Sequence, residues 1–272
     1  MTDFHTVKIS DPGIEATDLR FITVKSKALK RRADVTVFLP PHLSESDASG
    51  KLPLVILLHG VYGSHWDWSF KGRAHLTALD MIEQGEIGPM VIAMPSDSLW
   101  GDGSGYLELT FGNVEDWVVN EVPHCCLHLP ELSQGFTSLY IAGLSMGGYG
   151  ALRLGAKFCQ RFSGISGHSS ATDFKALDDF VEDPLDPHRI NSLEDADVFY
   201  WINKHRSDLP PLRFDCGIDD PLIDGNRKLH AKLEEAGIEH QYQEFPGAHE
   251  WPYWTEHLRE TLLFFDRIEK TK

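Results

Sequence analysis

The chain has 272 residues, of which 42% are hydrophobic and 24% charged, and these values are typical of a globular protein large enough for one α/β domain. Its 25 Lys and Arg stand against 41 Asp and Glu, and a net charge of −16 disfavours phosphate backbones and anionic lipids. Nucleic acids and membranes are therefore not expected partners, and no apolar run reaches the ~18 residues of a membrane span. The first ten residues lack the pattern of a secretory signal, which predicts a cytoplasmic protein.

Strand and helix patterns alternate along the chain. Polar and apolar residues alternate at Leu19–Ser26 and Val35–Leu39, which predicts antiparallel strands with one exposed face. Continuous apolar runs predict buried parallel strands at Leu52–Leu58, Met90–Met94, Leu139–Ala142, Phe162–Ser166 and Leu212–Cys216. Helical spacing follows at Val114–Leu127, Gly147–Phe158, Leu222–Ala236 and Trp254–Ile268. The order predicts an α/β fold with a mostly parallel central sheet and helices on both faces.

One segment, Ala171–Pro211, breaks this alternation. It is acidic, contains four prolines and carries the aromatic run Phe199–Trp201. A segment this short does not fold alone without cross-links such as disulfides or a structural metal. We therefore expect a cap-like insertion within a single domain spanning residues 1–272. Its aromatic residues either line a substrate pocket or only pack the insertion onto the sheet.

The four cysteines, Cys125, Cys126, Cys159 and Cys216, show neither a C-x-x-C pair nor zinc-ligand spacing. We interpret them as small buried apolar residues rather than as a redox or metal site.

The segment Gly-Leu-Ser-Met-Gly at residues 143–147 has the G-x-S-x-G pattern of a nucleophile elbow. A strand pattern precedes it and a helix pattern follows, which is the context that the sharp turn requires. Gly143 and Gly147 remove the Cβ atoms that would collide there, so that Ser145 projects at the carboxyl edge of the sheet. The N–H of Met146 opens the helix and can donate to an oxyanion.

A second oxyanion donor is expected from the loop after an earlier strand. Leu58-His59-Gly60-Val61 follows the apolar run that ends at Leu58. Gly60 permits a close backbone approach, and Val61 has an N–H to donate.

A serine nucleophile needs a base and an orienting acid, which follow it in the order acid, then histidine, in this fold class. The loop after Cys216 carries Asp219 and Asp220, of which we favour Asp220. His249 lies in a loop beyond a strand and before a helix, as the base requires. The other histidines after the acid loop lie within helical patterns or at the start of a strand, at His230, His257 and His240.

Four segments, Leu58–Trp66, Gly143–Leu152, Cys216–Leu222 and Phe245–Trp251, resemble the esterase D-like branch of the α/β-hydrolases. That branch includes tributyrin-type esterases, S-formylglutathione hydrolases, and acetyl xylan and feruloyl esterases. The resemblance spans about residues 20–268 and implies an α/β-hydrolase fold without a cofactor.

The resemblance also implies roles for single residues. The nucleophile maps onto Ser145, the acid onto Asp220 and the base onto His249, while Val61 and Met146 map onto the oxyanion donors. These positions predict a serine carboxylesterase that acts on small-molecule esters of short-chain acids, including acetylated sugars, through an acyl-enzyme.

Several alternatives stay open. The same residues can catalyse thioester hydrolysis on S-formylglutathione or acyl transfer to an alcohol. Two other classes are a non-catalytic binding module and a metal-dependent hydrolase that uses His59, His65 and Asp67. A homo-oligomer is left open as well. Candidate residues for the substrate pocket are aromatic, at Trp66, Trp100 and Trp201.

Overall fold

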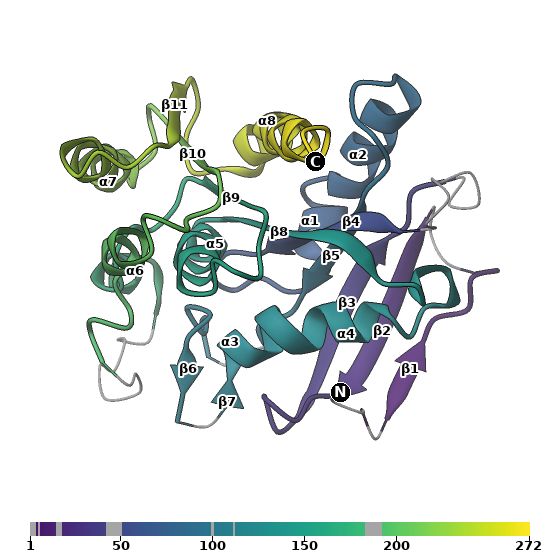
Figure 1. Cartoon of the computed structure of the whole chain (residues 1–272). Helices are drawn as coiled ribbons and strands as arrows, with labels where there is room; N and C mark the ends of the chain where they lie inside the picture. The colour runs from purple at the N-terminus through teal and green to yellow at the C-terminus, as the bar shows by residue number, and fades with distance from the viewer. Residues whose placement is uncertain are drawn as a thin grey trace.

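The computed structural model describes residues 4, 6–14, 18–41, 51–98, 101–110, 112–182 and 192–272. Within these ranges nine strands form one sheet in the order β1-β2-β3-β5-β4-β8-β9-β10-β11 (Figure 1). Their bounds are β1 Val7–Ile9, β2 Leu19–Lys25, β3 Arg32–Phe38, β4 Leu52–Leu58, β5 Val91–Pro95, β8 Phe136–Leu144, β9 Gly164–His168, β10 Leu212–Gly217 and β11 Gln241–Phe245. A separate small hairpin consists of β6 (Glu108–Leu109) and β7 (Gly112–Asn113).

The sheet is antiparallel at one end and parallel over the rest. Strands β1, β2, β3 and β5 pair antiparallel in turn. From β5 through β4, β8, β9 and β10 to β11, every pair is parallel. The carboxyl ends of these parallel strands therefore share one edge, and the loops that leave them meet there.

Helices cover both faces of the sheet (Figure 1). One face packs against α3 (Val114–Asp116), a π-helical segment (Trp117–Glu121), α4 (Val122–Cys126), α5 (Met146–Lys157), α6 (Val198–Lys204) and α7 (Ile223–Glu235). The other packs against α1 (Asp67–Phe70), α2 (Ala74–Glu83) and α8 (Trp251–Glu269). Short 3-10 turns occur at Pro130–Leu132 and Lys175–Phe180. The arrangement confirms the predicted α/β architecture.

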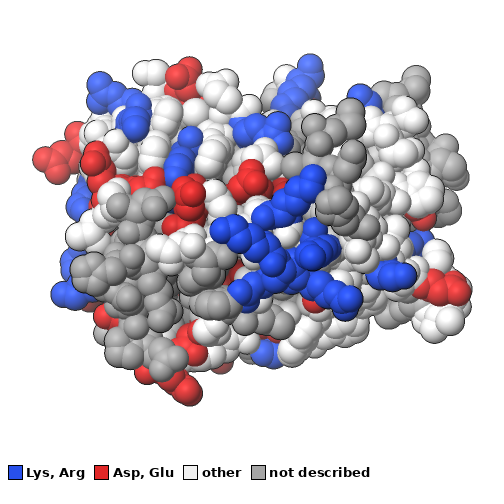
Figure 2. Space-filling model, turned by 90° about the horizontal axis from the view of Figure 1, so that it is seen from below, with Lys and Arg blue, Asp and Glu red and all other residues white. Residues whose placement is uncertain are grey.

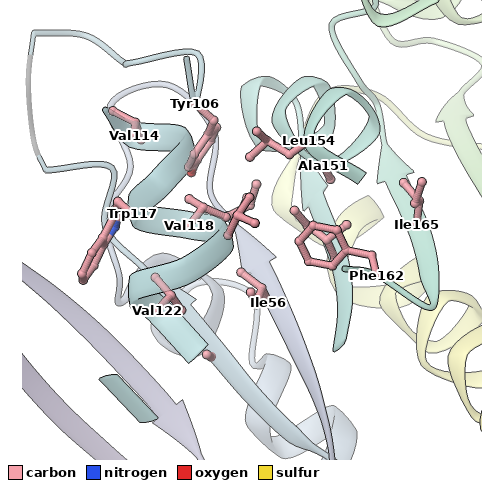
Figure 3. Packing of buried hydrophobic residues seen from close by; sticks show 14 of the residues in the cluster. Ile56, Tyr106, Val114, Trp117, Val118, Val122, Ala151, Leu154, Phe162 and Ile165 are labelled. Atoms are coloured by element: carbon pink, nitrogen blue, oxygen red, sulfur yellow. The ribbon is translucent and has the colours of Figure 1, made fainter. Parts of the chain in front are cut away.

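The core on the first face shows why the parallel strands are apolar throughout. Val118 points from the helical run toward β4, which carries Ile56, whereas Trp117 points from the opposite side of that run (Figure 3). Leu154 of α5 lies in the same cluster. Since a strand covered on both sides buries every side chain, β4 is buried along its whole length.

Several local predictions were wrong or incomplete. Strand β3 has no fully exposed face, because Thr36 and Phe38 are buried at 0% exposure under the second helical layer. The helix expected at Val114–Leu127 contains a π-helical turn between α3 and α4. The short helices α1, α2 and α6 were not predicted, and α8 begins at Trp251, three residues early, with a proline in its first turn.

A buried charge network ties α5 to its neighbours. The Arg153 guanidinium has no exposed surface and bonds the carboxylates of Glu115 and Asp195. Lys157 donates to the same two carboxylates, at 2.7 and 2.6 Å. Because each buried charge has partners, the network holds the end of the acidic insertion on the helix that begins after Ser145.

The four cysteines are free and buried, as interpreted from their spacing. Burial raises the pKa of the Cys126 thiol to about 12. Of the predicted insertion, residues 183–191, with two of its prolines, lie outside the described residues. Among the helices in the described ranges, none combines the length and apolar character needed to cross a membrane.

Candidate active site

Ser145 occupies a strained turn between β8 and α5. Its φ of 54° and ψ of −118° are unusual for a residue with a side chain. A Cβ at position 147 would overlap the carbonyls of Leu58 and His59, so only glycine permits this close approach to the loop after β4. The backbone N–H of Ser145 donates to the carbonyl of His168 at 2.9 Å, which fixes the turn to the end of β9.

Two side-chain hydrogen bonds join Ser145, His249 and Asp220. His249 Nε2 lies 3.0 Å from Ser145 Oγ, and His249 Nδ1 lies 2.9 Å from Asp220 Oδ2. Asp220 is buried, and its other oxygen accepts the Leu222 N–H at 2.8 Å. Asp219 is exposed instead, and its backbone N–H donates to the carbonyl of Gly247.

This arrangement allows proton transfer from the serine. When Nδ1–H donates to the Asp220 carboxylate, Nε2 presents its lone pair to the hydroxyl of Ser145. The imidazole can then take the hydroxyl proton during attack, and the buried carboxylate favours the cation that forms.

The two amides expected to bind an oxyanion flank the serine. A Cβ at Gly60 would lie 3.4 Å from Ser145 Cβ and 3.8 Å from its Oγ, so the loop carrying Val61 runs beside the hydroxyl. Met146 is the first residue of α5. Within the described part of the chain, neither the Val61 nor the Met146 N–H has a protein acceptor, so both are free to bind a ligand oxygen.

His59 holds the peptide that carries one of these amides. Its ring is buried, and Nδ1 donates to the carbonyl of Gly60 at 2.7 Å while Nε2 accepts the Asp97 N–H at 3.2 Å. The Gly60 carbonyl and the Val61 N–H belong to one peptide unit, so a donor on the oxygen fixes the direction of the N–H. The sequence marked His59 only as the start of the loop and as an alternative metal ligand.

The beginning of the insertion lies against the same site. The Phe180 ring lies 5.2 Å from the His249 ring, between centroids. The Glu182 N–H is shared between the hydroxyl of Tyr62 and Asp102 Oδ2, at 2.8 Å each. Sequence reasoning missed these residues, because no periodic pattern connects the three loops that carry them.

The three aromatic pocket candidates have different surroundings. Trp201 donates to the carbonyl of Asp195 at 2.9 Å, and its ring lies against the ammonium groups of Lys157 and Lys204. These contacts pack α6 onto α5. Trp66 is 40% exposed beside Lys71, and Trp100 lies outside the described residues.

His65 and Asp67 of the alternative metal site each have another partner. His65 Nδ1 bonds the hydroxyl of Thr36 at 2.8 Å, and burial lowers the pKa of the His65 imidazole. Asp67 lies next to Lys71, at 3.7 Å. In the ranges described above, no group of three or more His, Cys, Asp or Glu side chains has a geometry that could hold a metal ion.

A second buried network supports the loop that carries His249. Burial would raise the pKa of the Asp215 carboxyl, but His168 and Arg213 beside it and the Tyr253 hydroxyl outweigh this effect and lower that pKa to about 2. Tyr253 donates to Asp215 at 2.8 Å, and its ring packs under Gly247, where a Cβ would lie 2.8 Å from it. The charge on β10 thus fixes the turn that leads to His249.

Comparisons with known proteins give a family and a shared fold. A family model described as putative esterase matches residues 113–265. An acetyl esterase of Caldicellulosiruptor saccharolyticus is 28% identical over 273 residues, which cover 91% of this chain and 97% of the relative. The structure also superposes on a ferulic acid esterase with a TM-score of 0.77 at 24% identity, covering 98% and 99% of the two chains. An S-formylglutathione hydrolase from Agrobacterium tumefaciens superposes with a TM-score of 0.71 at 18% identity, again covering 98% and 99% of the two chains. These two structural similarities show a shared fold.

The two neighbouring aspartates should differ sharply on substitution. Asp220→Asn is expected to lower kcat by up to ~10⁴-fold, because an amide in place of the carboxylate favours the wrong imidazole tautomer. Asp219→Asn, whose side chain is exposed, should lower it far less. Steady-state kinetics on a p-nitrophenyl ester measure both, and a larger loss for Asp219→Asn would contradict the assignment.

His59→Ala is expected to lower kcat by up to ~10²–10³-fold with little change in KM, because a misdirected Val61 N–H weakens oxyanion binding in the transition state. His65→Ala is the matched control, since this nearby histidine bonds Thr36, and it should keep kcat. A loss expressed mainly in KM, or an equal loss in the control, would refute the positioning role of His59.

Proposed function

This chain belongs to the putative esterase family, in the esterase D-like branch of the α/β-hydrolases, and we propose that it is a serine carboxylesterase for short-chain acyl esters. The observation that carries this proposal is the pair of hydrogen bonds joining Ser145 Oγ to His249 and His249 to the buried Asp220. The acetyl esterase relative supports esters of a small acid, and we propose that the alcohol is a small one or that of an acetylated sugar.

The reaction proceeds in two halves. Ser145 Oγ attacks the ester carbonyl while His249 takes its proton, and the N–H groups of Val61 and Met146 bind the negative oxygen. His249 then gives the proton to the leaving alcohol as the carbon–oxygen bond breaks, which leaves an acyl group on Ser145. Water repeats the sequence with the same base, releases the acid and restores the serine.

Thioester hydrolysis is the second candidate. The solved S-formylglutathione hydrolase shares the fold over nearly the whole chain. The same three side chains and the same oxyanion donors would serve a thioester, so the choice depends on what the substrate pocket admits. Acyl transfer differs only in the acceptor, since an alcohol replaces water in the second half of the reaction.

Ser145→Ala should abolish turnover and labelling by a fluorophosphonate while the melting temperature stays close to that of the wild type, because only the hydroxyl is removed. Ser207→Ala, at an exposed position on the surface, is the control and should keep full activity. Activity of the Ser145 variant within tenfold of the wild type would overturn the proposal.

Short acyl chains should be preferred. We expect kcat/KM to fall from p-nitrophenyl acetate to the hexanoate ester, because the Phe180 ring, 5.2 Å from the His249 ring between centroids, would crowd a longer acyl chain. Acetylated sugars and S-formylglutathione are measured beside them, with and without an added acceptor alcohol. A preference for S-formylglutathione would favour the thioester candidate, and ester product formed from the alcohol would favour acyl transfer.

A further inference from the structure

A dense group of cationic side chains occupies the turn between β2 and β3. Five of the eight residues from 25 to 32 are Lys or Arg in a chain whose net charge is −16. We call this group the basic hairpin (Lys25, Lys27, Lys30, Arg31 and Arg32). All of its members except the half-buried Arg31 are exposed. Figure 2, which views the molecule from below, shows Lys and Arg side chains gathered in the middle of that face.

The turn that carries the basic hairpin is held from inside. The buried carboxylate of Glu121, from the π-helical segment, accepts the hydroxyl of Ser26 and the N–H groups of Lys27 and Ala28. The Ser26 hydroxyl in turn accepts the N–H of Leu29 at 2.9 Å. A buried acid therefore fixes the backbone, and the cationic side chains project from a preorganised surface.

Four charges of the basic hairpin, all but that of Arg31, do not stabilise the fold through ion pairs with described residues. Lys25 and Arg32 are direct cross-strand partners, and like charges in that position are destabilising. In the described ranges, Lys25, Lys27, Lys30 and Arg32 have no acidic side chain within ion-pair distance. Because no described residue neutralises these four charges, salt or an anionic partner would relieve their mutual repulsion.

The basic hairpin lies at the same edge of the sheet as Ser145. Strand β3 is antiparallel to β5, and Val35 pairs with Pro95, the last residue of β5. Strands β5, β4 and β8 are parallel, and β8 ends directly before Ser145. The start of β3 therefore lies beside the catalytic edge, three strand spacings or about 15 Å to the side.

We propose that the basic hairpin binds an acidic oligosaccharide, a sugar chain bearing carboxylates, and thereby brings an acyl ester on that chain to Ser145. Lys and Arg bind carboxylates through charge-assisted hydrogen bonds, and a chain of several sugars can span the distance between the two places. The second half of the proposal rests on the proposed esterase activity, whereas the binding does not.

The size and charge of the surface favour this partner over a larger one. On the face shown in Figure 2, acidic side chains lie next to the gathered Lys and Arg side chains. A flat anionic membrane or a long nucleic acid duplex would meet these acids together with the cations. A short sugar chain can hold most of its charge against the cationic side chains, so its attraction is offset less by the negative charge of the whole molecule.

Binding is tested on the full chain carrying Ser145→Ala, by calorimetry with an oligogalacturonate of about ten sugars at low salt. Adding Lys27→Glu and Lys30→Glu should raise the Kd by about tenfold or more and flatten its dependence on salt. Lys228→Glu with Arg267→Glu, two exposed positions on α7 and α8, changes the net charge equally and should raise the Kd less than twofold.

The same charge reversals in the active enzyme should raise KM for an acetylated oligogalacturonate and leave kcat/KM for p-nitrophenyl acetate unchanged. Absence of binding at low salt, equal weakening by the control pair, or tighter binding to phosphatidylserine vesicles or duplex DNA would overturn the proposal. Failure of the esterase proposal would appear separately, as turnover of p-nitrophenyl acetate that survives Ser145→Ala.

Discussion

The close approach of backbone segments at the turn of Ser145 is the constraint on which the rest of the site depends. The chain must leave β8, place a side chain at positive φ and begin α5 while touching the end of β4. Position 147 must be glycine, because a Cβ there would overlap the carbonyls of Leu58 and His59. That contact brings the loop with Val61 beside the serine, so one steric requirement positions both the proposed nucleophile and a proposed oxyanion donor.

Buried charges hold the loops that surround the turn of Ser145. Asp215 fixes the Gly247 turn through Tyr253, and Arg153 fixes the end of the insertion on α5. Each of these charges has a partner, because an unpaired buried charge would destabilise the fold by several kcal/mol. The result is a site whose members come from distant parts of the sequence and whose loops are held by buried, paired charges.

Charge is distributed unevenly over the molecule, and the net value hides this. A net charge of −16 disfavours polyanions on average, yet the basic hairpin concentrates five cations on one rigid turn. Association depends on the local potential within about a Debye length, ~10 Å at moderate salt, rather than on the sum over the chain. Composition therefore limits the partners of this protein less strictly than it first indicates.

The sequence by itself determined the features that depend on local pattern. Apolar runs predicted the parallel strands, and Gly143, Ser145 and Gly147 predicted the elbow, since sterics within five residues decide that turn. Only the tertiary structure decided which of Asp219 and Asp220 faces His249, that Phe180 rather than Trp201 lies against that histidine, and that the basic hairpin shares an edge with Ser145. These outcomes depend on how separate loops and strands pack, and no short segment encodes a contact with a partner that lies outside it.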